Sequence, residues 1–357
     1  MTAASSLLVS AAARRPIPPR PGQSLSGTTI STPLNAGIYL SAAYQLPLVV
    51  TDTGSVFVDG YYAAAIYSAI DQPATITNAG IISGGGYGIS LRDGGQITNG
   101  STYALTASIN GGYDGVLTGA RAPVTITNFA TIASTNLASG NGVNAGGDAT
   151  IINGTPDDTT ARISGYFDGV FVGGEARITN HGTISASAIS TQLGQSGVGV
   201  YLRSGGTITN GGTRDTAATI TAPMFAVQVT HAPGTVGNFG TILGTGPLAR
   251  GVLLQDGGKV MNGTYTDTTA TIFAQGKNGV YAGGTIASTV TNMGTITGGK
   301  NGVALQNGGT VINGARTSTG AQISGARQGI YIEGRVPSFV ANSGTIQSTG
   351  GDRRAHV

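Results

Sequence analysis

Apolar residues in this chain fall in short runs that alternate with polar residues and are separated by glycine, asparagine and serine. One phrase recurs, a β-branched residue followed by threonine or a similar residue and then asparagine, as in Ile76-Thr-Asn78. Two further apolar phrases follow, of the types Thr-Ile (Thr183-Ile184) and Gly-Val-x-Leu (Gly302-Val-Ala-Leu305). No segment shows the apolar period of about 3.6 residues that is typical of a helix. Each repeat therefore predicts three short strands separated by turns.

The asparagines set the length of the repeat, because successive members lie 21 to 30 residues apart. At about 3.3 Å per strand residue, this length allows one coil around a three-sided prism, and successive coils stack about 4.8 Å apart. The sequence therefore predicts an all-β fold, a parallel β-helix that forms a three-sided solenoid of about 11–12 coils of 21–30 residues. The asparagines are Asn78, Asn99, Asn128, Asn153, Asn180, Asn210, Asn238, Asn262, Asn292, Asn313 and Asn342.

The recurring asparagine has a structural explanation. Asparagine tolerates the left-handed backbone conformation at a tight corner, and its amide can bond to the asparagine one coil above and one coil below. We therefore expect the eleven asparagines to form an internal structural ladder rather than a set of ligand-binding residues.

Composition divides the chain into four parts. Residues 1–26 are a proline-rich leader that we expect to be disordered. Its apolar run precedes Arg14 and Arg15, the reverse of the order in a signal peptide, so a signal peptide is not convincing. Residues 27–73 are expected to form degenerate N-terminal coils or a cap, residues 74–350 the β-helix repeats, and residues 351–357 a tail.

Alternate coils carry an extra polar segment directly after their Asn-Gly pair. These segments are rich in threonine, aspartate and alanine, and they should leave one edge of the rod at every second coil, about 10 Å apart. They cover residues 101–106, 155–160, 213–218, 264–269 and 315–320.

Three stretches of the repeats resemble the passenger repeats of bacterial autotransporter proteins. They are Ile178-Thr-Asn-His-Gly-Thr-Ile184, Val290-Thr-Asn-Met-Gly-Thr-Ile296 and Gly197-Val-Gly-Val-Tyr-Leu-Arg-Ser-Gly-Gly206. The resemblance covers roughly residues 74–350. It implies an adhesin-like β-helical rod that is extracellular or at the cell surface, associated with the outer membrane. The chain departs from that family in lacking a C-terminal translocator barrel, since no alternating strands of about 10 residues follow residue 346.

Composition and charge remove several other classes of protein. The chain has 357 residues, 61 of them glycine, and no cysteine, so a disulfide framework and thiolate metal sites are excluded. Its 18 basic and 15 acidic residues form no charged run, and we therefore expect no nucleic-acid partner. No apolar stretch reaches the roughly 18 residues that a transmembrane helix needs.

The carboxylates offer one candidate for catalysis. Asp114 and Asp168 share the position before Gly-Val two coils apart, about 10 Å, just outside the range of about 5–9.5 Å that glycosidases use. The same position holds asparagine in three other coils: Asn141, Asn278 and Asn301. A turn preference explains both aspartates, so we expect no catalytic residue and no enzyme.

The histidines likewise indicate no site. His181, His231 and His356 do not repeat a ligand spacing, so we expect neither a metal nor a cofactor.

A carbohydrate-active β-helix enzyme, either a polysaccharide lyase or a glycosidase, is the alternative to a non-enzymatic rod. A truncated remnant without activity is the second alternative.

Aromatic residues on the outside of the rod are the candidate binding residues. In the Gly-Val-x-Leu phrase the valine and leucine point inward, so the residue x faces outward. Position x holds Phe171 and Tyr201 on adjacent coils and Tyr281 and Tyr331 two coils apart. Such side chains can stack on sugars or anchor a protein. Aromatic residues are also favoured in exposed β-strands that bind no ligand. The expected partners are a glycan, a host or bacterial surface, or further copies of the rod.

Overall fold

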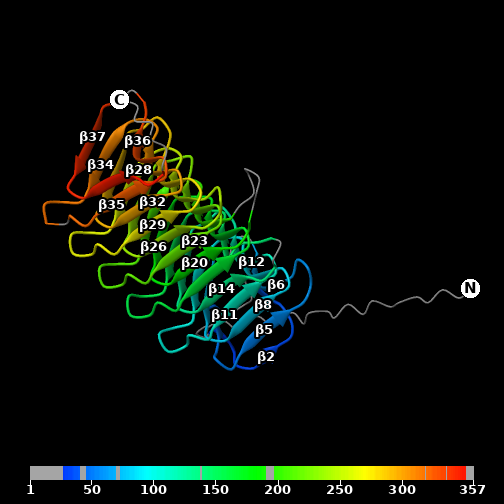
Figure 1. The fold of residues 1–357 in the computed structure, drawn as a ribbon. Helices are drawn as coiled ribbons and strands as arrows, with labels where there is room; N and C mark the ends of the chain where they lie inside the picture. Colours follow the sequence, from blue (N-terminus) through cyan, green and yellow to red (C-terminus); the bar gives the residue numbers. More distant parts are fainter. Residues whose placement is uncertain are drawn as a thin grey trace, which may run out of the picture.

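The computed structural model describes residues 27–40, 46–69, 73–136, 139–189, 197–317, 319–334 and 336–350. In this part of the chain every regular element is a β-strand, and the strands form three parallel sheets of 13, 13 and 12 strands. The chain visits the three sheets in turn and so winds into a rod (Figure 1). The predicted parallel β-helix is confirmed. The expected leader, residues 1–26, and tail, residues 351–357, lie outside the described residues.

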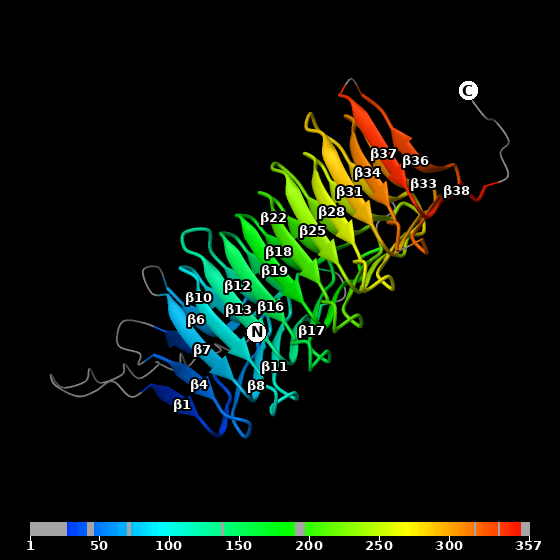
Figure 2. The same cartoon turned by 90° about the vertical axis from the view of Figure 1, so that its left-hand side faces the viewer.

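Sheet A is built from the asparagine phrase. In β13 (Val124–Asn128), Val124, Ile126 and Asn128 are buried, while Thr125 and Thr127 lie on the outer side. Figure 2 shows the strands of this sheet side by side along the rod. In spatial order they are β1 (Thr28–Ile30), β4 (Leu48–Val50), β7 (Ala74–Asn78), β10 (Gly95–Asn99), β13, β16 (Ala149–Asn153), β19 (Ala176–Asn180), β22 (Gly206–Asn210), β25 (Gly234–Asn238), β28 (Gly258–Asn262), β31 (Ser288–Asn292), β34 (Gly309–Asn313) and β37 (Ser338–Asn342).

Sheet B is built from the shorter Thr-Ile phrase. Each strand directs one isoleucine or a similar residue into the core, and Ile132, Ile163 and Ile184 stack in register with no exposed surface. Its strands are β2 (Pro33–Leu34), β5 (Ser55–Val58), β8 (Ile81–Gly84), β11 (Ser108–Gly111), β14 (Thr131–Ser134), β17 (Arg162–Gly165), β20 (Thr183–Ala186), β23 (Thr219–Ala222), β26 (Thr241–Gly244), β29 (Thr271–Ala274), β32 (Thr295–Gly298), β35 (Gln322–Gly325) and β38 (Thr345–Ser348).

Sheet C is built from the Gly-Val-x-Leu phrase. A Cβ atom on Gly115 would lie 2.8 Å from Cγ2 of Ile132 in sheet B, so glycine lets the two sheets approach at this corner. Its strands are β3 (Ile38–Leu40), β6 (Ala64–Ser68), β9 (Tyr87–Leu91), β12 (Asp114–Thr118), β15 (Val143–Ala145), β18 (Asp168–Val172), β21 (Val198–Leu202), β24 (Phe225–Val229), β27 (Arg250–Leu254), β30 (Asn278–Ala282), β33 (Asn301–Leu305) and β36 (Gln328–Ile332).

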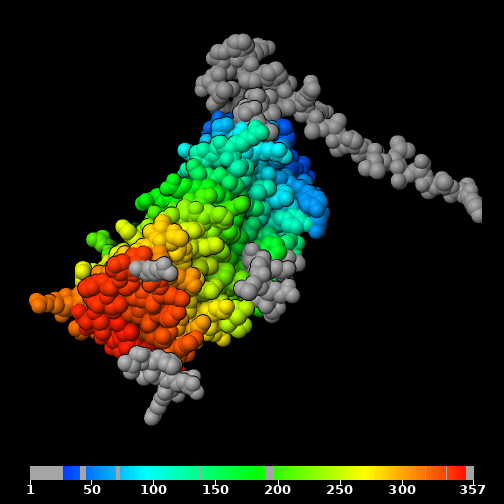
Figure 3. Space-filling model, turned by 90° about the horizontal axis from the view of Figure 1, so that it is seen from above, coloured from blue at the N-terminus to red at the C-terminus, as the bar shows by residue number. Residues whose placement is uncertain are grey.

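The core is one continuous column of apolar side chains inside the three sheets. Its buried members run from Ile38 in β3 to Ile323 in β35. In the space-filling view the colours follow one another along the long axis, so residues near in sequence lie near along the rod (Figure 3). Each coil therefore buries its apolar residues by stacking on its two neighbours.

Residues 27–73, expected to be degenerate coils or a cap, contribute β1 to β6 and continue the same three sheets. Val50 of β4 pairs with Asn78 of β7, and Tyr67 of β6 pairs with Ser90 of β9. Valine thus stands in this coil where later coils have asparagine. The backbone register is kept although the sequence phrase is lost.

A chain of side-chain hydrogen bonds connects the eleven asparagines of sheet A. In each step the Nδ2 atom of one asparagine donates to the Oδ1 atom of the next, at 2.7–2.9 Å, from Asn78 to Asn342. Asn210 is typical: its Nδ2 atom also donates to the carbonyl oxygens of Ala218 and Thr241, at 3.2 and 3.1 Å. The buried amides therefore join sheet A of each coil to the corner residue before sheet B in the same coil and to sheet B of the next coil.

The left-handed conformation does not lie at these asparagines, contrary to the sequence expectation. Among the described residues, His231 is the one non-glycine residue with a positive φ. Glycine that follows asparagine takes that conformation instead, as at Gly211 and Gly263, with φ of 77° and 74°. The asparagine stays extended because its side chain must point inward to its neighbours, and glycine makes the turn at little steric cost.

Polar loops leave the corner after alternate asparagines, where the sequence places the extra segments. Isolated antiparallel bridges close three of these turns, and they pair Ser101 with Ala104, Thr155 with Asp158 and Gly212 with Asp215. The loops project in a row along one edge of the rod, from cyan to orange in Figure 1.

Replacing Asn210 with alanine should destabilise the rod. It removes bonds to Asn180 and Asn238 and leaves buried polar groups unpaired. Each such group costs about 1–3 kcal/mol, so we expect the free energy of unfolding to fall by at least about 2 kcal/mol. The measurement is thermal melting followed by circular dichroism. Asn342→Ala, at the exposed end of the ladder, is the control and should change little; an unchanged melting temperature for Asn210→Ala would contradict the role of the ladder.

Candidate functional site

One outward-facing column of side chains runs along sheet C. The strand register aligns position x of every coil, and it extends the column predicted from the repeats by two tyrosines at its N-terminal end. In order, the column holds Tyr39, Tyr67, Ser90, Leu117, Asn144, Phe171, Tyr201, Gln228, Leu253, Tyr281, Ala304 and Tyr331. Because the coils repeat in register, a substitution at x changes the outer surface and leaves the core in place.

The four predicted binding residues fall into two separate pairs in this column. Phe171 and Tyr201 are adjacent, with ring centroids 5.3 Å apart and an angle of 70° between the ring planes. Tyr281 and Tyr331 are separated by Ala304. The first pair is an edge-to-face contact, whereas the second leaves a gap between its members.

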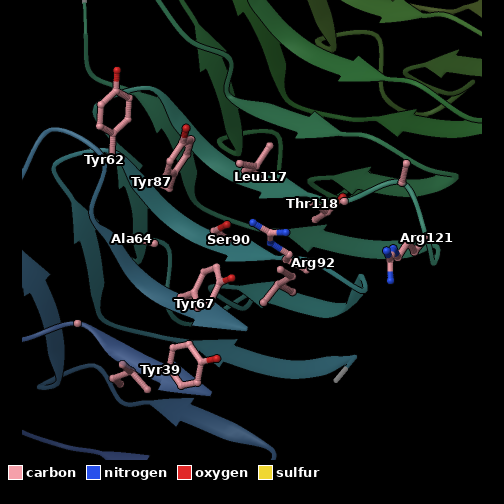
Figure 4. A pocket seen from close by; sticks show the side chains of 15 residues that line it. Tyr39, Tyr62, Ala64, Tyr67, Tyr87, Ser90, Arg92, Leu117, Thr118 and Arg121 are labelled. Carbon is pink, nitrogen blue, oxygen red and sulfur yellow. The ribbon is translucent and has the colours of Figure 1, made fainter. Parts of the chain in front are cut away.

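Another hollow on sheet C lies at the N-terminal end of the column (Figure 4). Its volume is about 840 Å³, and we call it the tyrosine groove. Tyr39, Tyr62, Tyr67 and Tyr87 line it on one side, and its floor includes Ser90, Leu117 and Thr118. Arg92 and Arg121 line the other side.

The groove presents aromatic faces in two clusters. The rings of Tyr39 and Tyr67 have centroids 5.2 Å apart and are tilted by 33°. Tyr62 stacks on Tyr113 at 5.6 Å with 7° between the ring planes, and Tyr87 lies 6.1 Å from Tyr113. Tyr39 is 56% exposed and Tyr62 is 72% exposed. These rings are held by one another, yet much of their surface faces solvent.

The charge of the groove is positive. Arg92 and Arg121 are exposed and line the groove, and its lining contains no aspartate or glutamate among the residues that the structure describes. Within the ranges that the structure describes, neither guanidinium forms an ion pair. Two guanidinium groups beside aromatic faces favour an anionic ligand, because guanidinium binds carboxylate and sulfate-like groups with two parallel hydrogen bonds.

Sequence reasoning missed the tyrosine groove for two reasons. Tyr39 and Tyr67 belong to coils in which the repeat phrase is degenerate. Tyr87 precedes Ile89 by two residues, so strict alternation would place both side chains in the core. The alternation is broken at Gly88: Ile89 is buried, whereas Tyr87 lies in the outer groove. The signal that could have found the groove was the density of tyrosine between residues 39 and 113.

The two candidate catalytic carboxylates are buried at the start of β12 and β18. Asn141, from the coil between them, donates its backbone N–H and its Nδ2 to Oδ1 of Asp114, at 2.8 and 3.1 Å. Its own Oδ1 accepts the backbone N–H of Asp168 at 3.1 Å. Both carboxylates are 5% exposed. The three residues form a second polar column, which stabilises the corner where sheet C begins.

Burial controls the protonation of these carboxylates. It raises the pKa of Asp168 to about 7, with a further contribution from the nearby Asp114. Burial also raises the pKa of Asp114, but hydrogen bonds from Asn141 and Asn144 oppose this shift. The ionised form of Asp168 is therefore the costly one.

Comparison with protein-family models, with curated proteins and with solved structures found no match. Among the described residues, no helix is long and apolar enough to cross a membrane. The same part of the chain contains no group of three histidine, cysteine, aspartate or glutamate side chains that could hold a metal ion.

Asp168→Asn should stabilise the protein at neutral pH and above but not at pH 4. Because the pKa of Asp168 is about 7 when folded and 3.8 in its ordinary state, the folded protein holds an extra proton between these values. Stability therefore falls as pH rises through this range, by up to about 1.4 kcal/mol per pH unit, and asparagine removes the effect. Melting temperatures at pH 4, 6 and 8 measure it. Asp157→Asn, in an exposed loop, is the control, and an equal gain at pH 4 and pH 8 would contradict the assignment.

Proposed function

We propose that this protein is a non-enzymatic β-helical rod that acts at a cell surface or after secretion, and that it binds glycans through the outer face of sheet C. The tyrosine groove is the observation that carries the proposal. It combines four exposed or partly exposed aromatic rings with two arginines in one hollow of about 840 Å³. This combination of large apolar faces and few polar groups is typical of a binding site.

The chemistry of the groove favours an acidic polysaccharide. Aromatic rings pack against the C–H faces of sugars, and an extended row of rings suits a chain of sugars better than a single compact ligand. Arg92 and Arg121 supply the charge that a uronate carboxylate or a sulfate group would pair with. The partner class is therefore a glycan that carries negative charge.

The shape of the rod supports a role in surface adhesion. A solenoid presents long, flat outer faces whose side chains can change without disturbing the core. The resemblance of its repeats to autotransporter passengers supports export and a place outside the cell, at the outer membrane or beyond it. The row of edge loops gives a second surface for contacts with a host, with bacteria or with other rods.

A carbohydrate-active enzyme is the second candidate, and the raised pKa of Asp168 is the observation that favours it. A general acid needs a pKa near the working pH. Against this, Asp168 and Asp114 are buried and separated by Asn141, which bonds to both residues. If the protein degrades any polysaccharide of a test panel and Asp168→Asn abolishes this activity, the enzyme is favoured. If no polysaccharide is degraded, the binding rod is favoured.

Replacing both Tyr39 and Tyr67 with alanine should weaken binding to immobilised alginate or heparin at least about fivefold. Each ring contributes roughly 0.5–1.5 kcal/mol beyond its buried area, and about 1.4 kcal/mol corresponds to a factor of ten. Tyr265→Ala, an exposed tyrosine on an edge loop, is the control and should bind as the wild type does. Equal binding by the double variant would contradict a role of the tyrosine groove in glycan binding.

Replacing Arg92 and Arg121 with glutamine should weaken the binding of acidic glycans but not that of neutral glycans. Binding to alginate and heparin should weaken and lose most of its dependence on salt, since screening acts on charge pairs. Any binding to neutral dextran should be unaffected. Arg203→Gln, elsewhere on the rod, is the matched control. Alginate binding that keeps its salt dependence in the double variant would show that the charge lies elsewhere.

A further inference from the structure

A second hollow lies on the outer face of sheet C, between Tyr281 of β30 and Tyr331 of β36. Ala304 of β33 pairs with both residues, so it forms the floor between two tyrosines that are two coils apart. At about 4.8 Å per coil, their backbones are separated by about 9.6 Å. The hollow has a volume of about 250 Å³, and we call it the Ala304 slot. The small side chain of Ala304 is what leaves this space in a column otherwise held by larger residues.

Neighbouring side chains hold the two tyrosines that flank the slot in place. The guanidinium carbon of Arg250 lies over the ring of Tyr281, 4.9 Å from its centroid, and 5.6 Å from the ring centroid of Phe225. Arg250 belongs to the coil before Tyr281, so it covers the ring from the side away from Ala304. The hydroxyl of Tyr331 donates to Oε2 of Glu333 at 3.0 Å. Rings that are fixed before a ligand arrives lose little conformational entropy on binding.

Amide groups form the polar wall of the slot. Asn278, Asn301 and Gln328 stand in register at the start of β30, β33 and β36, and all three line the slot. Asn278 is 6% exposed and Asn301 is 4% exposed, and within the described residues the Oδ1 atom of each has no hydrogen-bond partner. A buried acceptor without a partner costs about 1–3 kcal/mol, so rotation of these amides toward a hydroxyl donor in the slot would be favourable.

We propose that the Ala304 slot binds one pyranose residue of a glycan. The two tyrosines supply apolar faces on either side, and the amides supply donors and acceptors for ring hydroxyls. Lys300, Arg327 and Glu333 also line the slot with charges of both signs, so the slot, unlike the tyrosine groove, has no strong preference for an anion. The inference rests on the proposed function for the class of ligand, and it adds a separate site toward the other end of the same face.

Ala304→Tyr tests the slot by filling it. The column already accepts tyrosine one coil before and one coil after this position, so the fold should tolerate the change; melting followed by circular dichroism checks this. The probe is saturation-transfer NMR with the methyl glycosides of glucose, galactose, mannose and N-acetylglucosamine. Measurements use a background in which Tyr39 and Tyr67 are alanine, so that the tyrosine groove does not contribute.

We expect at least one glycoside to receive saturation in this background, and the transfer to fall at least fivefold with Ala304→Tyr but not with Ala304→Ser. Tyr281→Ser, which opens the slot without filling it, should give the same loss if Ala304→Tyr does not fold. Equal saturation transfer with and without Ala304→Tyr would overturn the proposed binding to the slot. The absence of transfer to any glycoside in the background protein would overturn it as well. If the slot binds no glycoside, the proposed function still stands, because glycan binding by the tyrosine groove is measured separately in the protein with Tyr39 and Tyr67 intact.

Discussion

The rod depends on one constraint, the fixed register between successive coils. The buried amides from Asn78 to Asn313 enforce it, because each must meet both the next asparagine and a carbonyl group of sheet B, as Asn78 meets Asn99 and Ser108. An unpaired amide in an apolar core is costly, so a shift by one residue would break bonds in two coils at once. Glycine at the sheet C corner also helps to fix the register, because the Ile132 side chain leaves no room for a Cβ on Gly115. Register held in this way arranges the outward side chains in straight columns.

Straight columns turn single residues into surfaces. Tyr39 beside Tyr67 makes an aromatic platform, Phe171 beside Tyr201 makes an edge-to-face pair, and Ala304 leaves a gap. None of these differences changes the core, since position x lies outside it. The proposed glycan-binding function therefore resides in the sequence of one column and its borders, while the other positions of each repeat maintain the scaffold.

The sequence predicts the fold well because the same physical demand recurs in every coil. A β-branched residue next to a buried asparagine, repeated at 21 to 30 residues, identifies the strands, the corners and the outward position x. It does not predict what depends on departures from the repeat. Tyr87 reaches the outer groove because alternation breaks at Gly88, and Tyr62 lies in a corner that no phrase marks. The left-handed residue is Gly211 rather than Asn210, since the side chain of Asn210 is committed to the core.

The proposed function requires that the outer face of sheet C contacts the glycan. Hydroxyl-radical footprinting with and without bound alginate, read by mass spectrometry at single tyrosines, tests it most directly. We expect alginate to reduce the oxidation of Tyr39, Tyr62 and Tyr67 and to leave Tyr103 and Tyr265 unchanged, because these two lie exposed on the edge loops. Protection of the edge-loop tyrosines with unchanged labelling of the groove would contradict it.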